Sequence, residues 1–328
     1  MIKASDVAFH TPVPTPYDWA ETNYFSYYIP EAYITASVYV IARPGVGACV
    51  VDVMAINKIG RLGLEALYID FQQHLPMPEK LENFTLPNGL SLSTSNAPRD
   101  YRLDYVGVNG TEMHLDIKGL HEPYDIHDPE MDPRAPKDRN DSGFGSAYSN
   151  HFDMTAHFTG TASFHGKSYN VDCVATMDHS WGPRNERGLK PIGWINGNFD
   201  RDFAFSTIWT LDHNASGWDQ FGLAHGYVLK DGEARGLVGG RLRAIRGGKI
   251  FPTGYEMVLT DRYGAEWRFL GIPTTQTPWN CYSNVTSVLS GMLWFHESRE
   301  GSGMAQENWP YDLLTGRLPG AENGVFLP

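Results

Sequence analysis

A short segment just past the middle of the chain gathers four side chains that can do chemistry. It reads MDHSWGPR, from Met177 to Arg184. Asp178 can act as a general acid or base if an apolar cavity raises its pKa, with His179 beside it as a proton partner. Trp181 can offer its indole face to a cation or an aromatic ring. Arg184 can bind a substrate carboxylate or pair with Asp178. The competing interpretation is structural: Asp178 and His179 cap backbone groups at a strand end, and Trp181 fills the end of a barrel.

The element that must position these side chains is a β-strand. The stretch from Tyr169 to Met177 alternates between two kinds of residue, which is typical of a strand. Neighbouring residues in a strand point to opposite faces of the sheet, so Asp178 and His179 can share a cavity only if the backbone bulges or turns. The Gly-Pro pair that follows them favours such a turn.

The rest of the chain predicts short antiparallel strands joined by tight turns. Segments with period-two alternation are separated by turn signals such as Asn109-Gly110, His165-Gly166 and Asp231-Gly232. There is no βαβ rhythm and no GxGxxG segment, so a Rossmann nucleotide site is not expected. The predicted fold class is therefore all-β, with two tandem antiparallel meanders closed as barrels or sandwiches.

We expect two domains of about eight strands each. The division is placed near Cys173, which gives an N-terminal domain over 1–172 and a C-terminal domain over 173–328. The C-terminal domain then carries the DHSWG segment at its start. One segment, Gly60–Leu75, fits either a helix or a strand, because its apolar residues satisfy both periods.

Composition argues against several classes of partner. The 328 residues include 38 Asp and Glu against 26 Lys and Arg, a formal net charge of −12. Nucleic acid and anionic membrane surfaces require clustered basic side chains, so we expect neither as a partner. No run approaches the ~20 apolar residues of a membrane helix, and no secretory signal is visible. We therefore expect a cytoplasmic protein without membrane insertion, in which Cys49, Cys173 and Cys281 are free thiols.

A polar segment rich in Asp, Pro and Gly, His121–Ser146, predicts a surface loop that links the domains or covers the mouth of the first one. Its histidines and aspartates have no established ligand spacing, so no metal site is predicted there. In the strand that follows, His151 and Asp153 project from the same face. They either reach a cavity or form a cross-strand pair.

Three segments of the chain resemble one group of proteins. HFTGTASFHGKSYNVDCVATMDHSWGPR resembles the central segment of the carotenoid 1,2-hydratase and AttH-like families, whose signature is D-H-[SN]-W-G. The aromatic-rich ETNYFSYYIPEAYITASVYVIARPG, which contains Glu21, Tyr24 and Phe25, is similar to their opening strands. FHESREGSGMAQENWP is similar to the glycine-rich closing segment of the bacterial members of this group that carry a DHSWGPR motif, written RDHSWGPR in those proteins. One departure is Met177, which stands where close bacterial relatives often have Arg.

The resemblance implies two lipocalin-like, calycin-type β-barrels with a ligand cavity at or between them. Activities in the wider group are water addition to isoprenoid double bonds and pericyclic ring closure, and neither needs a redox cofactor. Our first interpretation is a cofactor-independent lyase or hydratase that acts on a hydrophobic unsaturated small molecule, whether terpenoid, steroid or aromatic. The alternatives are a pericyclase or isomerase of the Diels-Alderase type and a non-catalytic carrier of an apolar metabolite.

The candidate site combines the motif with aromatic side chains on predicted strands. Asp178 and His179 are the candidate catalytic residues. The candidate substrate-binding residues are Trp181, Arg184, Trp194, Trp209, Tyr24 and His151. The alternative for the aromatic residues is a role in the core, where such side chains at strand spacing usually lie. We expect no metal and no cofactor, and a hydrophobic small molecule as the partner. The sequence leaves the oligomeric state open, with a homodimer as one possibility.

Overall fold

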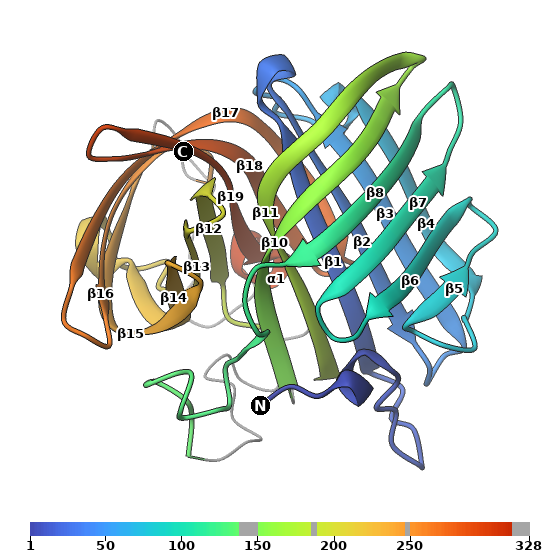
Figure 1. Ribbon diagram of the computed structural model, residues 1–328, viewed down its shortest axis with the longest axis horizontal. Helices are drawn as coiled ribbons and strands as arrows, with labels where there is room; N and C mark the ends of the chain where they lie inside the picture. Colours follow the sequence, from blue (N-terminus) through green and yellow to red (C-terminus); the bar gives the residue numbers. More distant parts are fainter. Residues whose placement is uncertain (138–149, 185–188, 247–249, 317–328) are drawn as a thin grey trace.

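The fold consists of two β-structures that lie side by side (Figure 1). A computed structural model describes residues 1–137, 150–184, 189–246 and 250–316. The N-terminal part is a curled sheet and the C-terminal part is a closed barrel, so the expected all-β class with two antiparallel domains is confirmed. The described helical segments are all short: η1 (Ala4–Val7), η2 (Pro30–Ala32), η3 (Gly63–Glu65), η4 (Gly217–Asp219) and α1 (Tyr311–Leu314).

The N-terminal sheet has eleven strands in the order β4-β3-β2-β1-β11-β10-β8-β7-β6-β5, and the short β9 pairs with β10 outside this path. The expected turns at Asn109-Gly110 and His165-Gly166 are confirmed, and both residues of each turn have positive φ. The strands are β1 (Trp19–Ile29), β2 (Ile34–Arg43), β3 (Ala48–Ile56), β4 (Tyr68–Pro76), β5 (Asn83–Thr85), β6 (Leu90–Asn96), β7 (Asp100–Val106), β8 (Glu112–Gly119), β9 (Tyr124–Asp125), β10 (Asn150–Phe164) and β11 (Lys167–Pro183).

The C-terminal barrel closes because its first strand pairs with its last as well as with its second. The interior is filled by the barrel's own apolar side chains, among them Phe205, Trp209 and Trp294. An ion pair of 2.9 Å between Arg246 and the buried Glu307 lies among them. The interior is therefore a packed core. The strands are β12 (Ile192–Asp200), β13 (Phe203–Leu211), β14 (Phe221–Lys230), β15 (Glu233–Arg246), β16 (Pro252–Asp261), β17 (Glu266–Tyr282), β18 (Val285–His296) and β19 (Arg299–Pro310).

The central strands of the sheet are buried on both faces. On the face toward the sheet's own core, Phe25 of β1 packs edge-on against Tyr101 of β7. On the opposite face, the hydroxyl of Tyr28 donates to Asn196 Oδ1 of the barrel strand β12 over 3.2 Å. The outer wall of the barrel therefore packs on the back of β1, and any site between the two parts draws residues from both.

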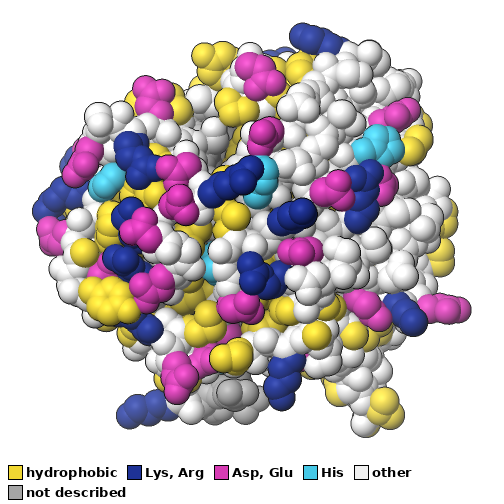
Figure 2. Space-filling view, viewed as in Figure 1, with side chains coloured by type: hydrophobic (Ala, Val, Ile, Leu, Met, Phe, Trp, Pro, Cys, Tyr) yellow, Lys and Arg dark blue, Asp and Glu magenta, His cyan; other side chains and the backbone are white. Residues whose placement is uncertain are grey.

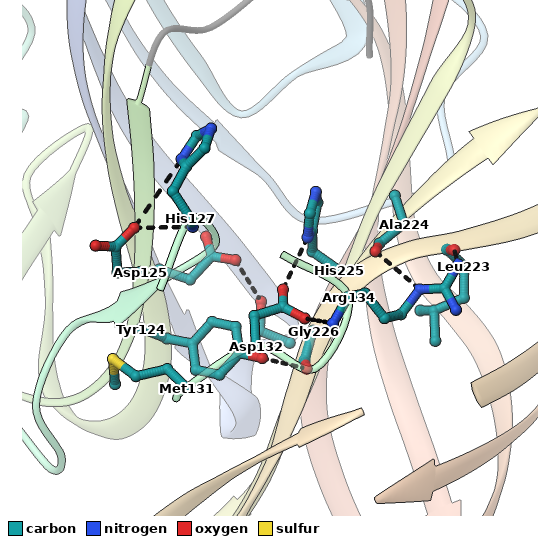
Figure 3. A network of polar contacts seen from close by, with 12 residues as sticks. Tyr124, Asp125, His127, Met131, Asp132, Arg134, Leu223, Ala224, His225 and Gly226 are labelled. Carbon is teal, nitrogen blue, oxygen red and sulfur yellow. Dashed lines mark hydrogen bonds and ion pairs between the residues drawn. The ribbon is translucent and has the colours of Figure 1, made fainter. Parts of the chain in front are cut away.

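A second connection between the two parts follows β9 (Figure 3). The hydroxyl of Tyr124 donates to the carbonyl oxygen of Gly226 over 3.0 Å, and the Asp132 carboxylate lies 2.7 Å from Nδ1 of His225. The guanidinium of Arg134 donates to two further carbonyl oxygens of β14. The described part of the expected loop His121–Ser146 thus packs against the barrel, and its residues 138–146 lie outside the described residues.

The surface is mixed in charge where it can be seen. Lys and Arg side chains alternate with Asp and Glu side chains over the face shown in Figure 2. Within the described residues, no helix has the length and the apolar character that crossing a membrane would require.

The observed strands bear on the expected domain division and on the segment that fitted either a helix or a strand. We expected the division between domains near Cys173, which lies within β11; in the structure the first sheet continues to Pro183 and the barrel begins at Ile192. The ambiguous segment Gly60–Leu75 contains the 3₁₀ turn η3 and most of strand β4. Its alternation, rather than its helical period, decides its structure, because it forms one edge of the sheet.

Candidate active site

Strand β11 lies between β1 and β10, and its register determines which side chains share a face. Asp178 is opposite Tyr24 on β1 and opposite Asp153 on β10. His179 is opposite Asn23 on β1. The pairing of β1 with β11 runs without a bulge through this region and continues to Pro183, so the expected turn is not formed. Asp178 and His179 therefore project from opposite faces of the sheet.

Asp178 lines a cavity between the sheet and the barrel. Five aromatic side chains, from both parts of the protein, share this lining: Tyr24, Tyr39, Trp194, Trp279 and Tyr282. The cavity volume is about 50 Å³, which is enough for a few water molecules but well below the ~150 Å³ that accommodates benzene. An organic ring can therefore enter only if side chains of the wall move.

The carboxyl group of Asp178 carries no hydrogen bond or ion pair with any residue in the described part of the chain. Burial raises its pKa to about 7, and the neighbouring Asp153 carboxylate acts in the same direction. The positive charges of His151 and Arg184 oppose this rise without cancelling it. Asp178 is thus a carboxyl group that faces a cavity and is partly protonated near neutral pH.

His151 lines the same cavity and is held by a chain of polar contacts. Its Nε2 lies 3.1 Å from one oxygen of Asp153, and the other oxygen of Asp153 accepts a hydrogen bond of 3.3 Å from Ser206. The indole N–H of Trp194 donates to the Ser206 hydroxyl over 3.3 Å. Burial disfavours the imidazolium, but the charge and the hydrogen bond of Asp153 outweigh it and raise the pKa of His151. The imidazolium and the neutral carboxyl of Asp178 are therefore compatible at the same pH.

Arg184 acts on the cavity through two of its lining residues. The guanidinium donates to the Ser180 hydroxyl over 2.6 Å and to the Tyr282 hydroxyl over 3.3 Å. The Tyr282 hydroxyl also contacts that of Tyr39. Since Ser180 and Tyr39 come from the sheet and Tyr282 from the barrel, Arg184 helps to join the two walls of the cavity.

His179 and Trp181 lie on the other face of β11. Nδ1 of His179 is 3.0 Å from Oδ1 of Asn23, and burial lowers the pKa of the imidazole to about 4. Trp181 stacks on His10, with ring centroids 3.9 Å apart. The structure therefore brings together four of the expected site residues, with Arg184 at the edge: Asp178, Tyr24, His151 and Trp194. It places His179 and Trp181 on the opposite face of β11, where Trp181 packs against His10 of the N-terminal segment, and it places Trp209 inside the barrel.

Several lining residues were not anticipated from the sequence. Tyr39, Trp279 and Tyr282 belong to strands far from the motif. Gln306 and Asn308 of β19 also line the cavity, and they lie in the closing segment already singled out for its resemblance. That resemblance was the only signal for them, because alternation alone does not tell which outer face of a barrel meets another sheet.

The polar residues that follow β8 are occupied by contacts within the protein (Figure 3). An oxygen of Asp125 accepts a hydrogen bond of 2.9 Å from the backbone N–H of His127. His121 is bound to the Tyr227 hydroxyl over 3.2 Å and to the backbone of Thr155. Among the residues that the structure describes, no group of three His, Cys, Asp or Glu side chains is arranged to hold a metal ion.

Three solved structures have a similar fold. Kievitone hydratase from Nectria haematococca matches with a TM-score of 0.55 and 9% identity, over 90% of this chain and 89% of that one. CghA with Sch210972 matches with a TM-score of 0.52 and 11% identity, over 88% of each chain. The protein assigned as AttH from Nitrosomonas europaea matches with a TM-score of 0.57 and 10% identity, over 89% of this chain and 92% of that one. At these identities the likeness establishes the fold, two lipocalin-like domains, and the expected resemblance to AttH is confirmed at that level.

Sequence comparison places the chain in a family without assigning it a reaction. No curated protein matches the sequence significantly. Residues 3–311 match a family described as a domain of unknown function, DUF7064, which covers both the sheet and the barrel. The chain is therefore a member of the DUF7064 family.

Proposed function

We propose that the protein is a hydratase, or the corresponding lyase, that acts on a hydrophobic unsaturated small molecule in the cavity between the sheet and the barrel. The observation that supports this most is Asp178. It is a carboxyl group without a protein partner in the described residues, with a pKa raised to about 7, facing aromatic side chains. A carboxyl held neutral in this way is suited to general acid catalysis near neutral pH.

The reaction needs only a proton, a water molecule and a surface that tolerates positive charge. The π electrons of the substrate double bond take the proton of Asp178, which leaves a carboxylate and a carbocation. The faces of Trp194, Trp279 and Tyr24 stabilise the cation. A water oxygen then forms a bond to the cationic carbon, and one of its protons passes to the Asp178 carboxylate. The sum is the addition of water, with the acid restored.

His151 and Asp153 support this cycle electrostatically. A protonated His151 beside the cavity stabilises the Asp178 carboxylate that forms after proton transfer. Asp153 compensates the charge of His151 and keeps the imidazole in place through the 3.1 Å contact. We assign His151 as a positioning and charge-balancing residue, and Asp178 as the group that exchanges the proton.

Two other functions remain as alternatives. A pericyclase depends on shape and a few hydrogen bonds, so the loss of Asp178 would slow it only modestly. A carrier would need no unpartnered acid. A carboxyl group that is withdrawn from bulk water without a hydrogen bond to the described protein residues is unfavourable for folding. A carrier would not need such a group, so its presence favours the enzyme.

The test is a mass-spectrometric screen of pooled unsaturated terpenoids, steroids and phenylpropanoids in water labelled with heavy oxygen. The native protein should form a labelled product that Asp178→Asn does not form. Asp172→Asn is the matched control, because Asp172 is on the same strand with its carboxylate exposed at the surface. An unlabelled product would identify an isomerase or cyclase. A compound that co-purifies unchanged and equally with native protein and Asp178→Asn would identify a carrier.

A further inference from the structure

Two carboxamide side chains form a polar patch on the barrel wall of the cavity. Gln306 and Asn308 alternate with inward-facing residues along β19, so both project outward toward the sheet. In the register of the barrel they lie opposite Trp194 and Ile192 of β12, which also line the cavity. We call Gln306 and Asn308 the carboxamide pair.

The carboxamide pair is held in one orientation from behind. Nε2 of Gln306 donates to Oδ1 of Asn308 over 2.9 Å and to the Ser287 hydroxyl over 3.3 Å. Oδ1 of Asn308 also accepts from Ser287 and from the thiol of Cys281. Ser287 is fully buried, and Gln306 is only 8% exposed. The two amides are therefore fixed before any ligand arrives.

One acceptor and one donor of the carboxamide pair are left for a ligand. Within the described residues, Oε1 of Gln306 and Nδ2 of Asn308 make no hydrogen bond to protein, although the other half of each amide is engaged. If both amides were turned over, the network behind them could be kept, and the cavity would still meet one acceptor and one donor. The result does not depend on which oxygen and nitrogen positions are assigned.

This arrangement selects among polar groups. A carboxylate has no donor for the acceptor, and an ammonium group has no acceptor for the donor, so each would satisfy only half of the patch. A hydroxyl satisfies both, since it donates one hydrogen bond and accepts another. A purely hydrocarbon ligand would leave both amide groups without hydrogen-bond partners. The cost of those unpaired groups lowers its affinity relative to a ligand with a hydroxyl group.

We infer that the substrate carries a neutral hydroxyl group, which donates to Gln306 Oε1 and accepts from Asn308 Nδ2, while its unsaturated carbons lie toward Asp178. The inference rests on the proposed function only for the second half of this placement. The hydroxylated class includes phenols and isoprenoid alcohols, and it excludes hydrocarbons and carboxylic acids. The carboxamide pair then determines which molecules bind as substrates, and Asp178 carries out the proton transfer.

The test uses three small alkenes as probes: styrene, 4-hydroxystyrene and 4-vinylbenzoate. Binding is measured by isothermal titration, and each mixture in heavy-oxygen water is then examined for product by mass spectrometry. Two hydrogen bonds predict that the native protein binds 4-hydroxystyrene about tenfold more tightly than styrene. The carboxylate of 4-vinylbenzoate should bind more weakly than 4-hydroxystyrene.

The variants Gln306→Met and Asn308→Leu keep the side-chain volume and remove the amide. Each should bring the preference for 4-hydroxystyrene over styrene to within about threefold. Asn280→Leu is the matched control. Asn280 of the barrel strand β17 also carries an amide, but it is exposed, and its Oδ1 accepts a hydrogen bond from the hydroxyl of Tyr311 in α1. Thermal unfolding checks that the variants fold; if one does not, the other carries the test.

Equal affinity for styrene and 4-hydroxystyrene, no binding of any probe, or an unchanged preference in both variants would overturn the inference. The two proposals fail separately. A hydroxyl preference that depends on the carboxamide pair, without labelled product, would keep this inference and count against the hydratase. Labelled product that depends on Asp178, without a hydroxyl preference, would do the reverse.

Discussion

Replacing Asp178 by Asn should make the protein more stable at alkaline pH, and the gain should disappear in acid. Burial raises the pKa of Asp178 in the folded protein to about 7, from an ordinary value of 3.8. Between these two values the folded protein keeps a proton that the unfolded chain has already lost. The free energy of unfolding of the native protein therefore falls as pH rises through this window and levels off above about pH 7. The amide of the Asp178→Asn variant cannot ionise, so the variant lacks this fall.

The size of the effect follows from the width of the window. A difference of about three pKa units corresponds to about 4 kcal/mol at full extent, because each unit is worth ~1.4 kcal/mol. Between about pH 5.5 and pH 8 the advantage of Asp178→Asn over the native protein should grow by about 2 kcal/mol. Urea unfolding curves at the two pH values, with equal slopes for both proteins, give this difference directly.

The matched comparison is Asp172→Asn on the same strand. Asp172 is exposed and its pKa is lowered by the hydrogen bond to His157, so this variant should show no gain at high pH. A stability difference between Asp178→Asn and the native protein that does not change with pH would refute the reasoning. It would mean that the carboxyl of Asp178 is ionised in the folded protein across the whole range.

Three further predictions follow from the same contacts. If Asp178 donates the proton, turnover measured as kcat/KM should fall about tenfold per pH unit above about pH 7; a flat profile from pH 6 to pH 9 would contradict a general acid. Arg246→Met leaves the buried Glu307 without its ion-pair partner and should cost about 3 kcal/mol or more in urea unfolding, while ligand affinity in the cavity stays unchanged. Gly110→Ala forces a side chain onto a residue with φ of +67° and should lower the free energy of unfolding by about 1 kcal/mol, visible as a lower Tm; an unchanged Tm would show that the hairpin turn relaxes freely.

Local features of this fold could be predicted from the sequence because they depend on short-range chemistry. The turns at Asn109-Gly110 and His165-Gly166 need residues that tolerate positive φ. Such residues, above all glycine and asparagine, can be recognised directly in the sequence. Period-two alternation likewise predicts that neighbouring residues such as Asp178 and His179 face opposite ways unless the strand is broken. The Gly-Pro pair after the motif suggested such a break, but the strand continues to Pro183 because β1 pairs with it to the end.

The cavity itself could not be predicted in this way. Its walls come from β1, β2, β10 and β11 on one side and from barrel strands on the other, and their meeting depends on long-range packing. The sequence pattern indicated Tyr24, His151 and Trp194 as aromatic or polar strand residues, but it contained no information that Gln306 and Asn308 would face them. Trp209 has the same pattern as Trp194, and only the side of the barrel wall on which each lies separates them.

The strand order has a consequence for how the protein is made. Strands β1–β4 and β5–β8, with β10, form two separate runs of neighbours, and β11 joins them by inserting between β1 and β10. As the chain leaves the ribosome, one edge of β1 therefore stays unpaired until its partner β11 has been synthesised, at about residue 183. Non-local pairing of this kind folds slowly and leaves an open edge exposed in the meantime. The strand that joins the two runs also carries Asp178, so this acid group takes its place only after about half of the chain has been synthesised.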